Sequence, residues 1–124
     1  MKLRLSARQR SFGGLLLLVL AVSAASSWWA GRYQSSLGER VAQSARPGDI
    51  QMLSSDTCGV CVVARRWFQT HGVTFSECSI ERDAACRQRF EVSLSPGTPV
   101  LIVRGQMQVG FSAERVAAGL MVLR

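Results

Sequence analysis

The sequence predicts an α/β domain with one mixed sheet, preceded by an apolar N-terminal helix. Three observations lead to this prediction. After residue 48, short strand-like segments alternate with segments of helical periodicity. Two cysteines two residues apart, Cys58 and Cys61, lie where the first of these strands passes into a helix. Before the domain, an uncharged run of about 20 residues is long enough to span a bilayer.

The chain begins with a basic flank, residues 1–11, and no charge then appears between Arg10 and Arg32. A charged flank followed by an apolar run is typical of a secretory signal, and this run also suffices for a membrane anchor. We expect residues 12–30 to be a transmembrane anchor, because the uncharged run continues past the small residues at 23–25 where a signal peptide would be cut. A cleaved signal peptide is the alternative, and a buried helix of a soluble protein is the third interpretation.

Both targeting interpretations place the domain outside the cytoplasm. The positive flank would stay in the cytoplasm, with the domain on the periplasmic side of the inner membrane or secreted to the periplasm. The even number of cysteines, four, suits an oxidising compartment. From Gly48 onward the arginines and the acids nearly balance, so the charge of the domain argues against a nucleic-acid partner.

Residues 31–48 are expected to form a juxtamembrane linker. Tyr33, Leu37 and Val41 recur at four-residue spacing, which predicts that part of this linker is helical. Pro47-Gly48 breaks the pattern and marks the start of the domain, residues 49–124.

Within the domain the pattern predicts four strands and three helices. Gly72 suits the residue after a helix, Asp83 and Ser112 suit N-caps, and Arg104-Gly105 suits a hairpin turn. The expected elements are a strand at 50–54, a helix at 58–71, a strand at 73–80, a helix at 84–92, strands at 100–103 and 107–111, and a helix at 113–122.

Cys58 is the candidate nucleophile. A disulfide to Cys61 across two residues closes and reopens easily, and a helix start stabilises a thiolate through its unpaired N–H groups. A thiolate attacks disulfides, so thiol–disulfide chemistry is the first hypothesis. A purely structural staple is disfavoured because so short a loop restrains little chain entropy. A pair of thiolates that binds copper(I) or zinc is the alternative.

Cys78 and Cys86 pose a second question. The first lies near a predicted strand end and the second in the following helix, so a structural disulfide can join them. The alternatives are two small buried apolar residues and a relay that passes electrons to the first pair. His71 lies about 15 Å along the helix from Cys61, which is too far for both to bind one metal ion. We therefore interpret His71 as an imidazole at the helix end, where the helix dipole favours it.

These features, in this order, resemble the thioredoxin superfamily, and the short form looks most like the glutaredoxins. The resemblance covers about residues 49–120 and is carried by three motifs: Cys58 with Cys61, Thr98-Pro99-Val100, and Gly110-Phe111-Ser112. It implies a thioredoxin-like fold of the glutaredoxin type, with a four-stranded mixed sheet flanked by three helices.

The resemblance also implies roles for individual residues. Cys58 would be the nucleophile, Cys61 the resolving cysteine, and Pro99 a cis proline that faces the dithiol. Thr98 would offer its backbone to an extended substrate, and in glutaredoxins the stretch that matches Gly110-Phe111-Ser112 contacts glutathione. The implied substrate-binding residues are Thr57, Thr98, Pro99, Gly110 and Phe111.

Departures from the family pattern narrow the expected function. Gly59-Val60 lies between the cysteines, and the domain contains no lysine. We therefore expect no bound cofactor, with glutathione left open, and a protein disulfide or dithiol as the partner. The sequence predicts a membrane-tethered or secreted thiol–disulfide oxidoreductase; a metal-handling module and a non-catalytic binding domain of this fold are the alternatives.

Overall fold

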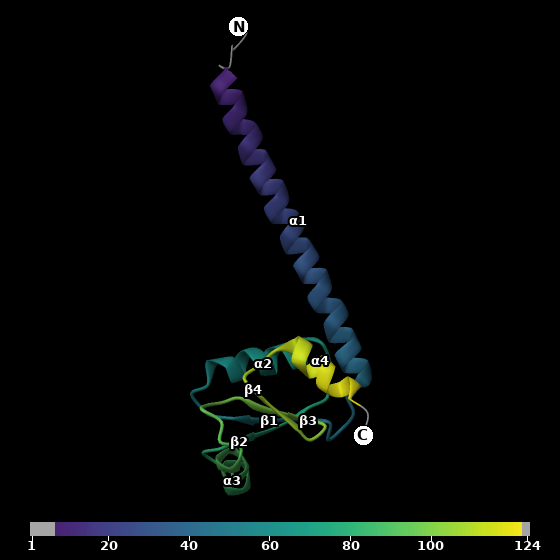
Figure 1. Cartoon of the computed structure of the whole chain (residues 1–124), viewed down its shortest axis with the longest axis vertical. Helices are drawn as coiled ribbons and strands as arrows, with labels where there is room; N and C mark the ends of the chain where they lie inside the picture. The colour runs from purple at the N-terminus through teal and green to yellow at the C-terminus, as the bar shows by residue number, and fades with distance from the viewer. Residues whose placement is uncertain (1–6, 123–124) are drawn as a thin grey trace. The chain divides into compact units, whose positions relative to one another are not determined.

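The computed structural model describes residues 7–122, so the first six residues of the predicted basic flank lie outside the described part, as do residues 123–124. The chain divides into two compact units, one ending at Gln34 and one beginning at Ser35. Helix α1, Ala7–Ser44, contributes residues to both units and is drawn as one unbroken helix (Figure 1).

The first unit holds the apolar part of α1. The segment Phe12–Ser44 is long and apolar enough to cross a membrane, and its most apolar 18-residue window has a mean hydropathy of 1.7. None of the side chains in its most apolar 18-residue window is buried. Near the end of this unit, the Arg32 guanidinium lies 4.4 Å from the centre of the Trp28 ring. By length and composition, this helix meets the requirements of a membrane anchor and of a signal sequence alike.

The second unit begins with the last turns of α1. These turns lie in the stretch that the sequence suggested as a linker, and one side of them is buried. Leu37, Val41 and Ala45 are buried, and they belong to the same hydrophobic cluster as Ile50 of the sheet. The four-residue spacing of the first two places them on one stripe of the helix, and this stripe covers the core. Residues 35–45 therefore contribute to the core of the compact unit that begins at Ser35.

The sheet has the four strands in mixed orientation that the sequence predicts. Strand β1, Ile50–Ser54, pairs in parallel with β2, Ser76–Ser79, and antiparallel with β3, Val100–Val103. Strand β4, Gln106–Val109, pairs antiparallel with β3, which gives the order β2-β1-β3-β4. The parallel pair places the end of β1 beside the end of β2, where the two following segments meet.

Three further helices cover the two faces of this sheet. Helices α2, Gly59–Thr70, and α4, Ala113–Met121, lie on one face, and α3, Ala84–Val92, lies on the other (Figure 1). The larger core cluster joins α1, α2 and α4 to β1 and β3. The smaller cluster, under α3, consists of Leu53, Cys86 and Val100 with four partly buried neighbours.

Most predicted ends are confirmed by local hydrogen bonds. Asp83 caps α3 by accepting the Cys86 N–H at 3.1 Å, and Ser112 caps α4 by accepting the Arg115 N–H at 3.3 Å. Gly72, with φ +65°, follows the C-cap of α2 in the left-handed conformation that favours glycine.

Two strands are shorter than the sequence predicts. Strand β2 begins at Ser76 and not at Val73, because the Val73 N–H is bonded to the Phe68 carbonyl at 2.9 Å and β2 pairs only with the residues of β1 from Gln51 onward. Strand β4 ends at Val109 because Gly110, with φ +75°, turns the chain out of the sheet.

An ion pair ties three ends of the domain together. The Arg104 guanidinium lies 3.2 Å from the carboxylate of Asp49, which is only 1% exposed. The same guanidinium donates to the carbonyls of Ser44 and Leu120. The pair therefore connects the end of α1 and the end of α4 to the start of β1.

Candidate active site

Cys58 and Cys61 lie where β1 passes into α2, and a disulfide joins them, with an S–S distance of 2.10 Å. Cys58 is the N-cap of α2 and is half-buried, whereas Cys61, one turn into the helix, is buried. The Cys61 N–H donates to the Cys58 sulfur at 3.0 Å. Of the two sulfurs, the one at the helix start is therefore the more accessible.

The helix start determines what a reduced Cys58 can do. The first N–H groups of a helix have no partner within the helix, and the helix dipole is positive there. A thiolate at this position gains a hydrogen bond and a favourable field, which lower the pKa of a thiol. The arrangement therefore suits a nucleophilic sulfur at Cys58.

The segment around Pro99 adjoins the loop that carries Cys58. The Thr98–Pro99 peptide bond is cis, as the resemblance implies, and Pro99 is fully buried. The Thr98 hydroxyl donates to the Ser55 hydroxyl at 3.1 Å, which joins this segment to the loop three residues before Cys58. The Gly110 N–H donates to the Pro99 carbonyl at 2.8 Å. The segment that holds Thr98 and Pro99 therefore joins the loop before Cys58 to the turn at Gly110.

Two other expected substrate-binding residues have different surroundings. Thr57 is exposed next to Cys58. Phe111 is half-buried, and its ring contacts those of Trp67 and Phe68, with centroids 5.7 and 5.5 Å apart. Part of the Phe111 ring is thus committed to packing against α2.

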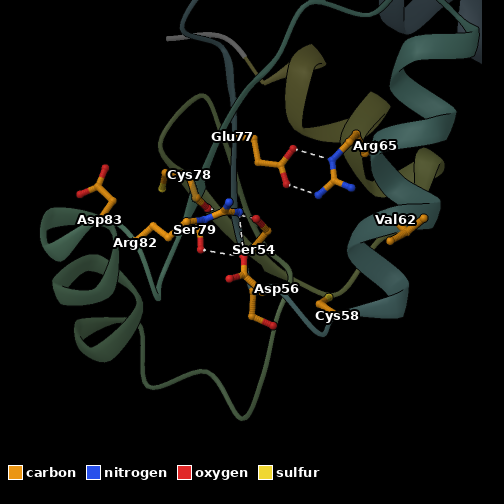
Figure 2. A pocket seen from close by; sticks show the side chains of 11 residues that line it. Ser54, Asp56, Cys58, Val62, Arg65, Glu77, Cys78, Ser79, Arg82 and Asp83 are labelled. Atoms are coloured by element: carbon orange, nitrogen blue, oxygen red, sulfur yellow. Dashed lines mark hydrogen bonds and ion pairs between the residues drawn. The ribbon is translucent and has the colours of Figure 1, made fainter.

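A pocket of about 590 Å³ opens beside Cys58 (Figure 2). Its wall is formed by the end of β1, the start of α2 and the segment that connects β2 to α3. Most of the side chains that line it are polar or charged. They are Ser54, Ser55, Asp56, Cys58, Val62, Arg65, Glu77, Cys78, Ser79, Arg82 and Asp83.

An ion pair crosses one side of this pocket. Arg65 of α2 donates two hydrogen bonds to the Glu77 carboxylate of β2, at 2.8 and 2.5 Å. The bond from Arg65 lowers the pKa of the Glu77 carboxyl, and Glu77 raises the pKa of the guanidinium in turn. The positive charge on the α2 side of the pocket is thus paired with a carboxylate.

A second network holds the loop before Cys58, on the other side of the pocket. Arg82 donates to the Asp56 carboxylate at 2.7 Å, and the Ser79 hydroxyl lies 3.3 Å from the same oxygen (Figure 2). The Glu81 carboxylate accepts the Asp56 N–H at 3.2 Å and the Ser79 hydroxyl at 2.9 Å. Desolvation raises the pKa of the Glu81 carboxyl. The hydrogen bonds from Ser79, from the backbone of Glu81 itself and from the Asp56 N–H, together with the charge of Arg82, have the larger effect, so the pKa lies below its ordinary value.

The other two cysteines are bonded to each other. The Cys78–Cys86 disulfide joins β2 to α3, with the Cα atoms 6.0 Å apart. Cys86 is buried in the smaller core cluster, and Cys78 is half-buried.

His71 is the C-cap of α2, and its Nδ1 lies 2.8 Å from the Trp67 carbonyl. The centroids of its imidazole and of a Trp67 ring lie 4.4 Å apart, with the two planes inclined by 37°. Among the described residues, no group of three or more His, Cys, Asp or Glu side chains is arranged to hold a metal ion.

The sequence did not reveal the charged residues around the pocket. Arg65 lies on the predicted helix at 58–71, and Glu81 and Arg82 lie in the connection between a predicted strand and the next predicted helix. Their partners are 12 to 26 residues away in the sequence, and the parallel pairing of β1 with β2 brings them together. The sequence does show that these residues carry opposite charges and so could form ion pairs. Their spacing does not show which of them pair.

Comparisons with known proteins agree with this geometry. The profile of the Glutaredoxin family matches residues 50–108. A mutant of a thioredoxin-like protein is similar in structure, with 26% identity, a TM-score of 0.54, and coverage of 59% of this chain and 95% of that one. The glutaredoxin-like protein NrdH-redoxin from Escherichia coli has 17% identity and a TM-score of 0.51, over 56% of this chain and 91% of that one. The search of curated proteins gives no match.

Proposed function

The domain that contains residues 50–108 is a glutaredoxin-family thiol–disulfide oxidoreductase with a Cys58/Cys61 pair, and on this premise we propose that its substrates are disulfides of partner proteins outside the cytoplasm. The observation that carries the proposal is the position of Cys58. Its sulfur lies at the start of α2, it is the more accessible of the two, and a pocket with polar walls opens beside it.

The reaction follows from the two positions of the sulfurs. The Cys58 thiolate attacks one sulfur of a partner disulfide, an S–S bond forms between the proteins, and the other partner sulfur leaves as a thiolate. The Cys61 thiolate then attacks Cys58, and the second partner sulfur leaves. Two electrons have passed to the partner, and the domain ends in the oxidised state that the structure describes. The reverse sequence oxidises a partner dithiol.

The pocket favours a polypeptide with polar side chains around its cysteine. Ser54, Ser55 and the two ion pairs present hydrogen-bonding groups along the path to Cys58. Thr98 lies next to this path through its bond to Ser55. An extended chain that reaches Cys58 past Thr98 and the pocket would meet these groups.

The rate at which each cysteine is alkylated tests this proposal. We expect Cys58 in the reduced full-length chain to react faster than Cys61 at neutral pH, with an apparent pKa below the free value of about 8.5. Mass spectrometry of the peptides that carry each cysteine, over a series of pH values, measures both. Equal and slow alkylation of the two cysteines would rule out a thiolate at the helix start.

We also propose that residues 12–30 anchor the domain to a membrane. The support is the long apolar segment of α1, with no buried side chain in its most apolar part, and the basic flank before it. The experiment separates membranes from soluble protein after an alkaline wash and identifies the N-terminus of the product. An intact chain in the membrane fraction is expected; a soluble chain that begins after residue 25 would show that the segment is a cleaved signal.

A further inference from the structure

The segment between β2 and α3 holds the loop that precedes Cys58. The Asp56 N–H donates to the Glu81 carboxylate at 3.2 Å, and Arg82 donates to the Asp56 carboxylate at 2.7 Å. The Ser79 hydroxyl lies 3.3 Å from the Asp56 carboxylate and 2.9 Å from the Glu81 carboxylate, and its single proton serves one of them at a time. The position of Asp56, two residues before the nucleophile, therefore depends on Ser79, the last residue of β2, and on Glu81 and Arg82 of the segment that follows.

These contacts alone do not explain a fixed loop. Asp56, Glu81 and Arg82 are exposed, and hydrogen bonds and ion pairs between exposed side chains are weak because water competes and the side chains lose freedom. They hold a loop in place only when the backbone that carries them is already fixed.

The Cys78–Cys86 disulfide supplies such a constraint. It closes a ring that contains Ser79, Glu81 and Arg82, since its two cysteines are eight positions apart in the sequence. One end of the ring is anchored in the sheet, where Cys78 pairs with Leu53 of β1, and the other end is anchored by the buried Cys86. A short closed ring leaves its residues few alternative conformations.

We propose that the Cys78–Cys86 disulfide is a positioning element for Cys58. It fixes Glu81, which accepts the Asp56 N–H and so holds the loop of residues 55–57, and Arg82, which neutralises the Asp56 carboxylate. The inference rests on the function proposed above, because it concerns the reactivity of the same sulfur. It assigns to the second disulfide an effect on the chemistry in addition to any effect on stability.

The charges around Cys58 give the direction of this effect. The charged groups that line the pocket beside Cys58 are Asp56, Arg65, Glu77, Arg82 and Asp83. Arg65 and Glu77 neutralise each other, and Asp56 is neutralised by Arg82. If the ring opens, Arg82 is no longer held beside Asp56, whose negative charge then disfavours a thiolate at Cys58. The loop also becomes free to move the sulfur away from the start of α2.

The test measures one thiol in two backgrounds. In full-length Cys61→Ala, purified in detergent, Cys58 is the only free thiol and Cys78 stays bonded to Cys86. The comparison variant adds Cys78→Ala and Cys86→Ala. We expect its Cys58 to be alkylated about two- to fivefold more slowly at neutral pH, with the pH profile moved to higher pH, which is the size of a helix-terminus effect. An unchanged pH profile in the comparison variant would overturn the inference.

A matched pair at residue 81 covers the case in which the comparison variant folds poorly. Glu81→Gln and Glu81→Ala both remove the charge, but only Gln keeps an oxygen that accepts the Asp56 N–H. In the Cys61→Ala background we expect the Ala variant to react more slowly than the Gln variant. Both variants keep the second disulfide, so equal rates of the two would show that the disulfide does not act through Glu81 and would overturn the inference.

The two proposals fail in different ways. If Cys58 in Cys61→Ala titrates like a free cysteine, the proposed function fails. If Cys58 shows a lowered pKa that removal of Cys78 and Cys86 does not change, the function stands and the positioning role is wrong. Glu91→Ala, an exposed acid on α3 outside this network, is the control and should leave the profile unchanged.

Discussion

The backbone N–H of Cys61 points at the sulfur of Cys58, at 3.0 Å, so the nucleophile is also the N-cap of its helix. A serine at position 58 can accept the same N–H, whereas an alanine cannot. We therefore expect Cys58→Ala to be less stable than Cys58→Ser by about 1 kcal/mol, because both variants lack the first disulfide and differ only in the cap. Urea denaturation measures the difference. Equal stability would mean that the sulfur does not cap α2.

The pair of Asp49 and Arg104 predicts a large effect far from the cysteines. Arg104→Met should cost about 3 kcal/mol of unfolding free energy, because it removes a cation that lies 3.2 Å from the carboxylate of Asp49, which is 1% exposed. The double variant Asp49→Asn with Arg104→Met is the control. It carries no buried charge and should recover part of this loss. Thermal unfolding of the three proteins makes the comparison.

The bond between Arg65 and Glu77 predicts a pH dependence. The folded state lowers the pKa of Glu77, so the pair stabilises the fold at pH values above the ordinary pKa of 4.5. This contribution is lost as the pH falls through the lower pKa of the folded state. Glu77→Gln should therefore be less stable than the native chain at pH 7, by about 0.5 kcal/mol, and equal to it at the acid end of the series. Denaturation from pH 7 downward checks both points, and a difference that stays constant with pH would refute the linkage.

Gly38 of α1 lies against the imidazole of His71. A Cβ atom at this glycine would be 1.9 Å from the His71 Cδ2 atom, so the site has no room for a methyl group. Gly38→Ala should destabilise the domain by about 1–3 kcal/mol, although alanine favours a helix. Adding His71→Ala should restore part of the loss by opening the space. A gain of stability in the single variant would show that α1 does not approach α2 here.

The sequence predicts those parts of this fold that depend on neighbours in the chain. The strand at residues 100–103 and the caps at Asp83 and Ser112 carry strong local signals, and the structure has them at these positions. Both disulfides join cysteines that are close in the sequence, three and eight positions apart, which is why the sequence could suggest them. Each of these features is determined within about ten residues, which is the range over which a sequence pattern is informative.

The parts that the sequence did not predict depend on contacts across the fold. The spacing of Leu37 and Val41 shows an apolar stripe, but it does not show that the stripe covers the same core as Ile50. In the same way, nothing near Asp56 indicates that Arg82 neutralises it, because the pairing of β1 with β2 brings the two together. The surroundings of the nucleophile, unlike its position, are therefore a result of topology.

The covalent complex that each cysteine can form tests the central claim most directly. In full-length Cys61→Ser, a partner attacked by Cys58 cannot be released. A mixed disulfide with a protein that carries a disulfide should therefore accumulate, and reduction should cleave it into the two proteins. Cys58→Ser should form no such complex. Equal trapping by both variants, or trapping by Cys58→Ser alone, would contradict the assignment of Cys58 as the attacking sulfur.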